Sequence, residues 1–522
     1  MRNLLSSIVL AALCITASGQ SWIARYDGPA GDEDQPYGIA VDDSGYVYVT
    51  GTSWGTGTSH DFATVKYGTS GETLWVRRFD GAASGSDHAR GIAVSGDRVA
   101  VTGGVAGPDL YTDLFTIVYS TDGESLWTAS FDGPGSGNDH GLAVAFGNDY
   151  DVYATGYSSD TLNGWDYITM KYDRNGTEQW VSRLSTVYED YAVAMAIDSG
   201  GNCHVTGNSG SPYFLTWDYV TTKYDADGVE QWTRRYEGPA FEDDEARAIA
   251  VDGAGNVYIT GGSRDSTTGP DFTTIKYDPN GDTLWLRRYD GPAGGTDEAN
   301  GLAIDGAGNV YVAGFSQDTA TDYDFATVMY SSDGALQWVA RYDGPVSEYD
   351  EARAITVDDQ GGVYVTGTST GDGTRGDFAT VKYSMSGTEV WVQRYDGPAS
   401  RFDEPAAMVL DRRGGICVTG GSAGDGTITD YATIRYLSTG IAETRPRTGS
   451  TPIPVCRVVR DVVQLPAAWK DAVLLNVAGF RVLDLVPGDN DVSRISPGVY
   501  FVHASADEDA GPAVTNRVIV AH

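Results

Sequence analysis

One tryptophan position recurs along most of the 522-residue chain and restricts its architecture more than any other feature. Successive copies are separated by 52 or 53 positions, and they are Trp22, Trp75, Trp127, Trp180, Trp232, Trp285, Trp338 and Trp391. Three further segments rich in Val, Ile, Thr, Tyr and Phe lie between neighbouring tryptophans, as at residues 38–42, 47–51 and 61–67. Short runs of this composition, bounded by Gly and Asp turns, predict four strands in each repeat.

The two ends of the repeat array predict a closed ring. A single four-stranded sheet cannot bury both faces, so the sheets must stack, either as a capped linear solenoid or radially as a β-propeller. The chain starts with an isolated tryptophan strand at residues 21–26, whereas the last repeat stops at Tyr436 without one. Because the first strand can complete the last sheet, two open edges disappear. We therefore predict an all-β fold: an eight-bladed β-propeller with four-stranded blades, closed by the N-terminal strand, with the tryptophans packed between blades.

The repeats resemble the bacterial SBBP β-propeller repeat family over nearly all of residues 21–436, and residues 250–261 and 301–314 are the most regular copies. The resemblance implies a propeller fold and an exported surface protein. It implies no particular chemistry, because propellers carry many unrelated functions. The family name implies seven blades, whereas the repeat spacing here predicts eight.

The composition outside the repeats predicts the remaining domains. Residues 1–19 combine Arg2, an apolar run at residues 4–15 and small residues, which is typical of a signal peptide. Cys14 raises a lipoprotein alternative, although it follows Leu13 and not a small residue. No later apolar run approaches 18 residues, so no transmembrane segment is expected in the mature chain. The predicted domains are a signal peptide (1–19), a propeller of ~53-residue repeats (20–436), a linker (437–454) and a C-terminal domain (455–522).

The C-terminal domain alternates turn residues with five short apolar runs, which is typical of a small β-sandwich. It resembles the Ig-like sorting domain of the type IX secretion system through residues 475–483, 496–502 and 517–520. The resemblance implies that the secretion machinery recognises residues 455–522. It also implies that the protein is secreted or displayed on the outer surface of a Gram-negative-type bacterium. An Ig-like accessory domain without a sorting role is the alternative.

The formal net charge of −37 argues against nucleic acid and anionic membranes as partners. Acidic residues recur after each tryptophan strand, which predicts an acidic ring on one face of the propeller. Clustered carboxylates suit hard cations, so Ca²⁺ is the one cofactor expected, with candidate ligands Asp243, Asp244, Asp297, Glu298, Asp350 and Glu351. The alternative is that these acids pair with recurring arginines such as Arg78, Arg247 and Arg353 and only stabilise turns.

Aromatic residues distinguish the third and fourth repeats. In the loop before the third strand these repeats carry Trp165, Tyr213, Phe214 and Trp217, where other repeats mostly carry Gly, Ser and Thr. Exposed aromatic rings stack on sugars or anchor protein partners, so we predict a binding patch for a glycan or a surface protein. The alternative is that these rings pack on each other as a local loop core.

No catalytic residue is predicted. The sequence contains no His-Glu-x-x-His motif and no phosphate loop, and its Gly-x-Ser-x-Gly stretches at residues 51–55, 367–371 and 420–424 recur at one repeat position without a predicted helix after them. It also lacks the adjacent cysteine pair that is common in eight-bladed quinone dehydrogenases. We therefore expect a non-enzymatic, secreted or cell-surface propeller for adhesion or ligand binding. The alternatives are a polysaccharide-active hydrolase or lyase that uses carboxylates on the acidic face, and a structural surface-layer component.

Overall fold

The computed structural model describes residues 20–438, apart from residues 109–110, 136, 161–163, 187, 211–215, 268, 320–321 and 425, together with the strands of the tail. The chain divides into two units, residues 19–442 and a second unit formed by the rest of the chain. The predicted signal peptide and nearly all of the predicted linker lie outside the described residues.

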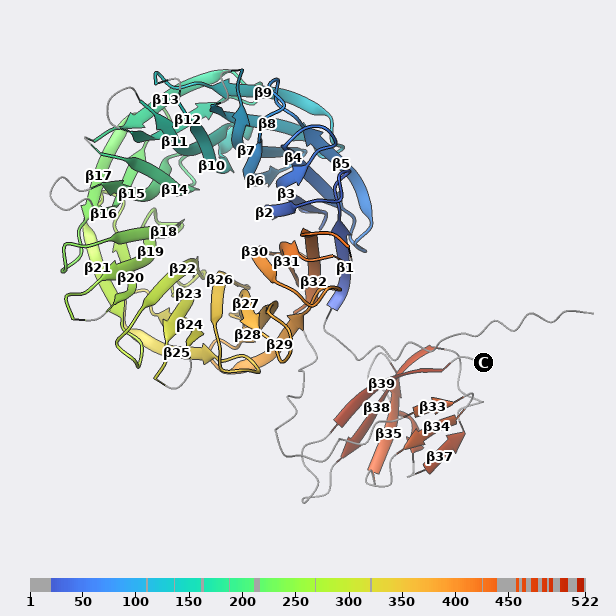
Figure 1. Ribbon diagram of the computed structural model, residues 1–522. Helices are drawn as coiled ribbons and strands as arrows, with labels where there is room; N and C mark the ends of the chain where they lie inside the picture. The colour runs from blue at the N-terminus through green and yellow to red at the C-terminus, as the bar shows by residue number, and fades with distance from the viewer. Residues whose placement is uncertain are drawn as a thin grey trace, which may run out of the picture. The chain divides into compact units, whose positions relative to one another are not determined.

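Eight antiparallel four-stranded sheets follow one another around a ring in the first unit (Figure 1). This confirms the predicted eight-bladed propeller. Blades 1 to 7 are β2–β5, β6–β9, β10–β13, β14–β17, β18–β21, β22–β25 and β26–β29, and blade 8 contains β30–β32 and β1. The first strand of each blade lies nearest the ring axis and the fourth lies outermost (Figure 1).

The strand bounds repeat almost without change from blade to blade. The first strands are β2 (Asp34–Val41), β6 (His88–Ser95), β10 (Asp139–Phe146), β14 (Asp190–Ile197), β18 (Asp244–Val251), β22 (Asp297–Ile304), β26 (Asp350–Val357) and β30 (Asp403–Leu410). The second strands are β3 (Val47–Trp54), β7 (Arg98–Ala106), β11 (Val152–Ser159), β15 (Cys203–Gly210), β19 (Val257–Arg264), β23 (Val310–Gln317), β27 (Val363–Thr370) and β31 (Gly415–Ser422). One 3-10 turn, η1 (Asn148–Tyr150), precedes β11.

The outer half of each blade is equally regular. The third strands are β4 (His60–Tyr67), β8 (Thr112–Ser120), β12 (Trp165–Tyr172), β16 (Trp217–Tyr224), β20 (Pro270–Tyr277), β24 (Tyr323–Tyr330), β28 (Gly376–Tyr383) and β32 (Asp430–Leu437). The fourth strands are β1 (Gln20–Tyr26), β5 (Thr73–Phe79), β9 (Ser125–Phe131), β13 (Glu178–Leu184), β17 (Glu230–Tyr236), β21 (Thr283–Tyr289), β25 (Leu336–Tyr342) and β29 (Glu389–Tyr395).

The N-terminal strand closes the ring. β1 pairs antiparallel with β32, with Ile23 opposite Ile434 and Tyr26 opposite Tyr431. It therefore supplies the fourth strand of blade 8, as the two ends of the repeat array predicted. The pairing joins residues near opposite ends of the propeller sequence, so that neither β1 nor β32 is left as a free sheet edge on that side.

The core lies between the blades, where each fourth-strand tryptophan meets the next sheet. Every such tryptophan lies beside a third-strand tyrosine of the following blade, at ring-centroid distances of 5.5 to 6.3 Å. Trp22 also donates a hydrogen bond to the carbonyl of Thr69 at 3.2 Å. The second and third strands are almost wholly buried, as in β3 and β4. The predicted role of the tryptophans as packing between blades is confirmed.

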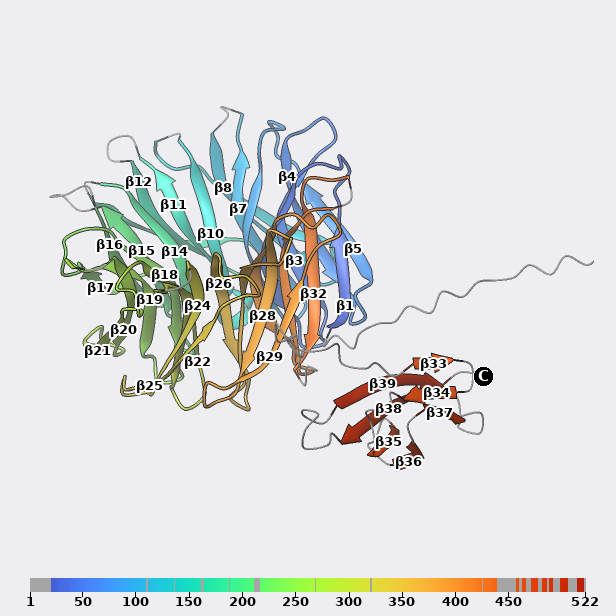
Figure 2. The same cartoon turned by 60° about the horizontal axis from the view of Figure 1, so that its bottom comes forward.

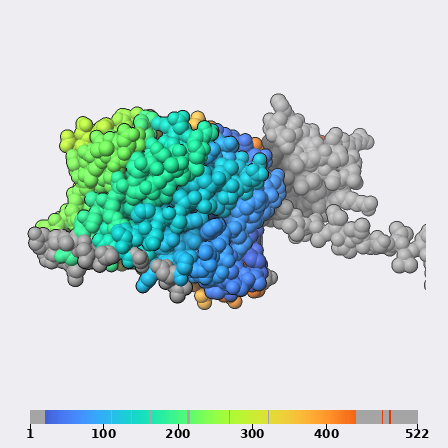
Figure 3. All heavy atoms as spheres, turned by 90° about the horizontal axis from the view of Figure 1, so that it is seen from above, coloured from blue at the N-terminus to red at the C-terminus, as the bar shows by residue number. Residues whose placement is uncertain are grey.

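The blades pack side by side, and their strands run between the two faces of the ring (Figure 2). In the space-filling view, the blades of the first half of the ring, coloured blue to green, pack directly against one another (Figure 3). Among the described residues there is no helix with the length and hydropathy needed to cross a bilayer.

The second unit contains two sheets. One has the order β33 (Arg457–Val459), β34 (Val462–Leu465), β37 (Gly488–Asp491), and the other has the order β36 (Arg481–Leu485), β35 (Asp471–Asn476), β38 (Gly498–Ser505), β39 (Val514–Val520). Leu474 and Leu485 are buried in it. The Ig-like sandwich and its sorting role stay predictions.

Candidate functional site

One end of the ring carries two loops from every blade, and we call this end the loop face. In blade 1 the start of β2 pairs with the end of β3, through Asp34 and Ser53, and the end of β3 pairs with the start of β4, through Trp54 and His60. The loop that enters a blade and the loop between its second and third strands therefore lie at the same end. Function on propellers usually resides in such loops, because the strands behind them are rigid.

A buried aspartate clamps the entry loop of each blade. This residue stands at or just before the start of the first strand, and it is fully buried in all eight blades. In blade order the clamps are Asp34, Asp87, Asp139, Asp190, Asp244, Asp297, Asp350 and Asp403. Its Oδ2 accepts a hydrogen bond from a backbone N–H of the preceding loop, as from Gly28 at 2.5 Å and Gly291 at 2.8 Å. These carboxylates hold the loop against the sheet.

Three of the predicted calcium ligands, Asp244, Asp297 and Asp350, are clamps of this kind. Burial raises the pKa of each to about 6, and hydrogen bonds from the clamped loops lower it only in part. Asp297 and Glu298, like Asp350 and Glu351, are successive residues of one strand, so their side chains point to opposite faces of the sheet.

In blades 6 and 7 the residue after the clamp contacts a side chain of the preceding blade. Glu298 Oε2 lies 2.9 Å from Arg247 Nη2, and Asn300 donates to Glu351 Oε1 at 3.1 Å. Arg353 lies 3.3 Å from Glu351. Asp243 stands before β18, and one of its oxygens accepts a hydrogen bond from the N–H of Trp217 at 3.1 Å. The alternative prediction, that acids of this face pair with recurring arginines, therefore describes Glu298 and Glu351 correctly.

This post-clamp position divides the loop face into two halves. Blades 5 to 8 carry glutamate there, and blades 1 to 4 carry glutamine, histidine or tyrosine; in blade order the residues are Gln35, His88, His140, Tyr191, Glu245, Glu298, Glu351 and Glu404. The predicted acidic ring is thus limited at this position to half of the circumference.

A chain of aromatic and imidazole rings crosses the non-acidic half. Trp54 lies 4.5 Å from His60, His60 lies 5.7 Å from His88, and His88 lies 6.4 Å from His140, measured between ring centroids. The chain continues from His140 to Tyr157 at 5.3 Å, and from Tyr157 to Trp165 at 4.8 Å. In blade 4, Tyr191 lies 5.0 Å from Trp217. We call these eight residues the aromatic arc: Trp54, His60, His88, His140, Tyr157, Trp165, Tyr191 and Trp217.

All eight residues of the aromatic arc are partly exposed. Two predicted binding residues, Trp165 and Trp217, belong to the arc, and each contacts a tyrosine ring of its own blade, Trp165 in a tilted and Trp217 in an edge-to-face arrangement. Tyr213 and Phe214 lie outside the described residues. Sequence reasoning missed His60, His88 and Tyr191, because they stand in different blades. Aligning the repeats in register would have found them, since they occupy the first position of a third strand or the post-clamp position.

The two histidines at the post-clamp position should titrate far below the ordinary range. Burial, with Arg90 and a neighbouring imidazole, lowers the pKa of His88 and of His140 to about 4. Between this value and the unfolded value of about 6.5 the unfolded chain binds more protons, so stability is lost as the pH falls through that window. We expect imidazole NMR signals of both residues to stay those of the neutral form down to about pH 5.

A histidine variant tests the same window through stability. When the pH falls from 7.5 to 5, the free energy of unfolding of the parent protein should fall by about 1–2 kcal/mol more than that of His88→Gln. Gln35→Ala, at the same position of blade 1, is the control and should follow the parent protein at both pH values. Equal responses of His88→Gln and the parent protein would contradict the assignment.

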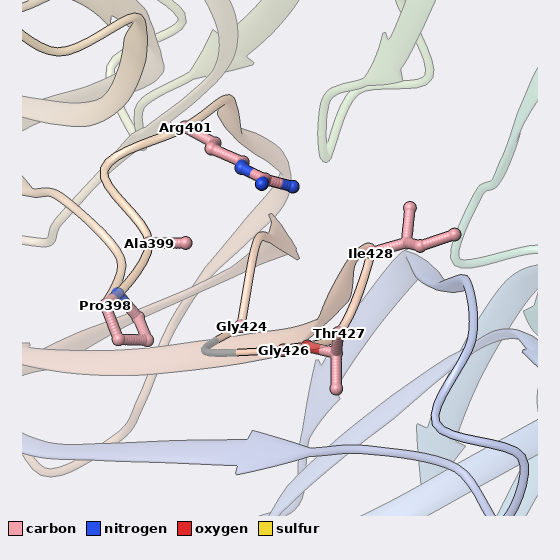
Figure 4. A pocket seen from close by; sticks show the side chains of 7 residues that line it. All are labelled: Pro398, Ala399, Arg401, Gly424, Gly426, Thr427 and Ile428. Atoms are coloured by element: carbon pink, nitrogen blue, oxygen red, sulfur yellow. The ribbon is translucent and has the colours of Figure 1, made fainter.

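Two hollows open on the loop face. One of about 460 Å³ lies in blade 8, where Arg401 and Ile428 project from two loops (Figure 4); its lining residues are Pro398, Ala399, Arg401, Gly424, Gly426, Thr427 and Ile428. A smaller one of about 90 Å³ lies between blades 5 and 6 and is lined by Asp243, Glu245, Arg247, Gly262, Arg264, Pro270 and Glu298.

Comparison with protein families agrees with the fold. The SBBP beta-propeller repeat matches residues 24–57, 231–265, 287–318 and 337–373. These stretches cover parts of blades 1, 5, 6 and 7 and of the fourth strands that precede them.

Individual relatives are distant. The regulatory protein FlaEY of Caulobacter vibrioides is 30% identical over 129 residues, which are 22% of this chain and 13% of that protein. A WD repeat-containing protein of Acanthamoeba polyphaga mimivirus is 22% identical over 307 residues, which are 49% of this chain and 20% of that protein. This chain thus spans at most a fifth of the length of these two relatives. A solved gluconolactonase of Xanthomonas campestris is 16% identical, with a TM-score of 0.29, and the match covers 55% of this chain and 90% of that one.

Proposed function

We propose that this protein is an exported, non-enzymatic propeller that binds a glycan through the aromatic arc of its loop face. The observation that carries the proposal is the grouping of eight partly exposed rings in four consecutive blades. Aromatic faces stack on the apolar faces of sugar rings, and the rings are already held in place by their neighbours. A ligand that stacks on them therefore requires little rearrangement of the protein.

The surroundings of the carboxylates support binding over catalysis. The clamp aspartates accept backbone hydrogen bonds, as Asp297 does from Gly291. Glu298 lies against Arg247. Acids that are engaged in this way are poorly placed to exchange protons with a substrate. The loops between second and third strands are also nearly equal in length, whereas catalytic sites on repeat scaffolds usually need one loop that departs from the symmetry.

Export is part of the proposal and rests on the sequence. Residues 1–19 would act as signal peptide, and residues 455–522 would be recognised by the secretion machinery. The protein would then reach the outer surface or the medium, where polysaccharides and surface proteins are the available partners.

Removing the two tryptophans of the arc tests the proposal. We expect Trp165→Ala combined with Trp217→Ala to weaken glycan binding by at least about tenfold, since buried aromatic contacts contribute about 2 kcal/mol or more each. Binding is measured on a glycan array and then by calorimetry with the best ligand.

The matched control is Tyr323→Ala, at the first position of the third strand in blade 6. It removes an aromatic ring from the acidic half and should leave glycan binding unchanged. If the double variant keeps its melting temperature and binds glycans like the parent protein, the arc is structural. Turnover of a polysaccharide by the purified protein would instead favour a hydrolase or lyase.

A further inference from the structure

Three aspartates converge at the junction between blades 1 and 2. Asp61 is the second residue of β4, Asp80 follows β5, and Asp87 is the clamp of blade 2. One carboxylate oxygen from each lies within 4.8 Å of the others. Two of the three acids therefore come from one blade and the third comes from the next.

The same cluster recurs around the ring, because the repeat brings the same three positions together at several junctions. Further clusters with this spacing are Asp27, Asp34 and Asp430; Asp113, Asp132 and Asp139; Asp271, Asp290 and Asp297; and Asp324, Asp343 and Asp350. The cluster with Asp34 lies where blade 8 meets blade 1, beside the strand pair that closes the ring.

Two of these clusters contain a buried carboxylate oxygen without a hydrogen-bond donor. Within the described part of the chain, Asp61 Oδ1 and Asp430 Oδ1 have no such partner. Both residues are 4% exposed. A buried anionic oxygen without a donor is costly, and a bound ion or water is the usual explanation in native proteins.

The nearby positive charge does not balance these clusters. In the cluster of Asp61, Arg78 Nη2 lies 2.7 Å from Asp61 Oδ2. Of the three acids, Asp61 alone has a guanidinium partner among the residues that the structure describes. Among the same residues, the clamp Asp87 accepts hydrogen bonds only from the backbone N–H groups of Gly81 and Ala106. A cation among the three oxygens would supply the missing charge.

The spacing of the oxygens suits calcium. Ca²⁺ binds oxygens at about 2.3–2.6 Å, so two ligands of one ion lie no more than about 5 Å apart. It accepts six to eight oxygens in flexible geometry, and carbonyls or waters can complete a set of three carboxylates. Mg²⁺ demands a stricter octahedron and gives up its waters reluctantly.

We propose that these three-aspartate clusters are Ca²⁺ sites that join neighbouring blades. The ligand set is one third-strand aspartate, one aspartate after the fourth strand and one clamp of the next blade. It replaces the sequence-adjacent pairs that were expected, and it is independent of glycan binding. Calcium then stabilises the ring, including its closure at Asp27, Asp34 and Asp430.

The junction of blades 2 and 3 offers an internal comparison. Seven blades have arginine where Arg78 stands in blade 1, but blade 2 has Ser130, whose hydroxyl donates to Asp113 Oδ2 at 3.2 Å. We expect Ser130→Arg to place a guanidinium beside this cluster and to weaken calcium binding there.

Calcium binding to the full mature chain tests the proposal through the exposed member of two clusters. Asp80→Asn combined with Asp290→Asn removes one ligand from each cluster and leaves the ion pairs Arg78–Asp61 and Arg288–Asp271 intact. Asp227→Asn removes one exposed acid in the turn at the opposite end of blade 4 and is the control for loss of surface charge. Equilibrium dialysis with radioactive calcium gives the stoichiometry, and calorimetry gives the melting temperature with calcium or with a chelator.

We expect the parent protein to bind several calcium ions with dissociation constants of about 10⁻⁴–10⁻³ M, and to melt at least about 5 °C higher in calcium than in chelator. The double variant should bind about two fewer ions, while Asp227→Asn binds as many as the parent protein. No thermal shift in calcium would overturn the proposal. So would an equal shift with magnesium or with sodium chloride of the same ionic strength, or equal calcium losses in the double variant and the control.

Discussion

Deletion of residues 20–26 is expected to open the ring and to produce the largest loss of stability of any short deletion in the propeller. These residues form β1, the fourth strand of blade 8. Without them β32 becomes a free edge, and Trp22 no longer packs on Tyr67 of blade 1. Loss of a buried tryptophan alone costs about 3–5 kcal/mol, and the backbone pairing with β32 is lost as well. We expect a fall in melting temperature of more than about 10 °C, measured by calorimetry.

An exposed edge strand also recruits other chains, so the shortened protein should form oligomers in size-exclusion chromatography. A synthetic peptide with the sequence of residues 20–26 should restore both the monomer and part of the lost stability. As a matched pair on the same strand, Trp22→Ala should be strongly destabilising. Ile23→Ala should cost little, because Ile23 is 44% exposed. A shortened monomer that melts like the parent protein would show that β1 does not close the ring.

Replacement of Arg288 by methionine is expected to destabilise the propeller by about 2–4 kcal/mol, measured by denaturant unfolding. Arg288 Nη2 lies 3.0 Å from Asp271 Oδ2 and also donates to the carbonyl of Ser263 at 2.7 Å. It thereby links the third strand, the fourth strand and the end of the second strand of blade 5. Methionine fills a similar volume but leaves a carboxylate of which only 5% is exposed without its guanidinium.

Arg287 is the matched control, because it is the preceding residue on the same strand. Its guanidinium lies over the ring of Trp285, and its Nε donates to the carbonyl of Gly334 at 2.5 Å. It has no buried carboxylate to neutralise, so Arg287→Met should cost about 1 kcal/mol. A double-mutant cycle of Arg288→Met with Asp271→Asn should give a coupling energy above about 1 kcal/mol. Additive effects in that cycle would show that the ion pair contributes nothing to stability.

The propeller fold could be predicted from the sequence because each repeat contains the strand pattern of one complete blade. Trp391 and its seven counterparts recur at a nearly constant spacing, and residues that must pack in the same way in every blade show such a spacing. The closure of the ring was equally accessible, since the surplus strand with Trp22 and the incomplete repeat that ends at Tyr436 complement each other.

The candidate site was only partly accessible. Trp165 and Trp217 stood out, because other repeats have small residues nearby. His60 and His88 did not, since each is an ordinary surface residue until two blades bring their rings to 5.7 Å. The acidic pairs did not indicate the clusters at the blade junctions, because adjacency along a strand places Asp297 and Glu298 on opposite faces of the sheet.

The sequence by itself determined the number of strands, the number of blades and the way in which the ring closes, because these depend on a spacing of equivalent residues that recurs in every repeat. Only the tertiary structure decided which side chains meet. Contacts at a junction join the end of one repeat to the beginning of the next, as Asp61 and Asp80 of blade 1 join Asp87 of blade 2. Which acids converge and which rings form the arc therefore depends on strand alternation and on the stacking of neighbouring sheets, and the order of residues along one strand does not reveal either.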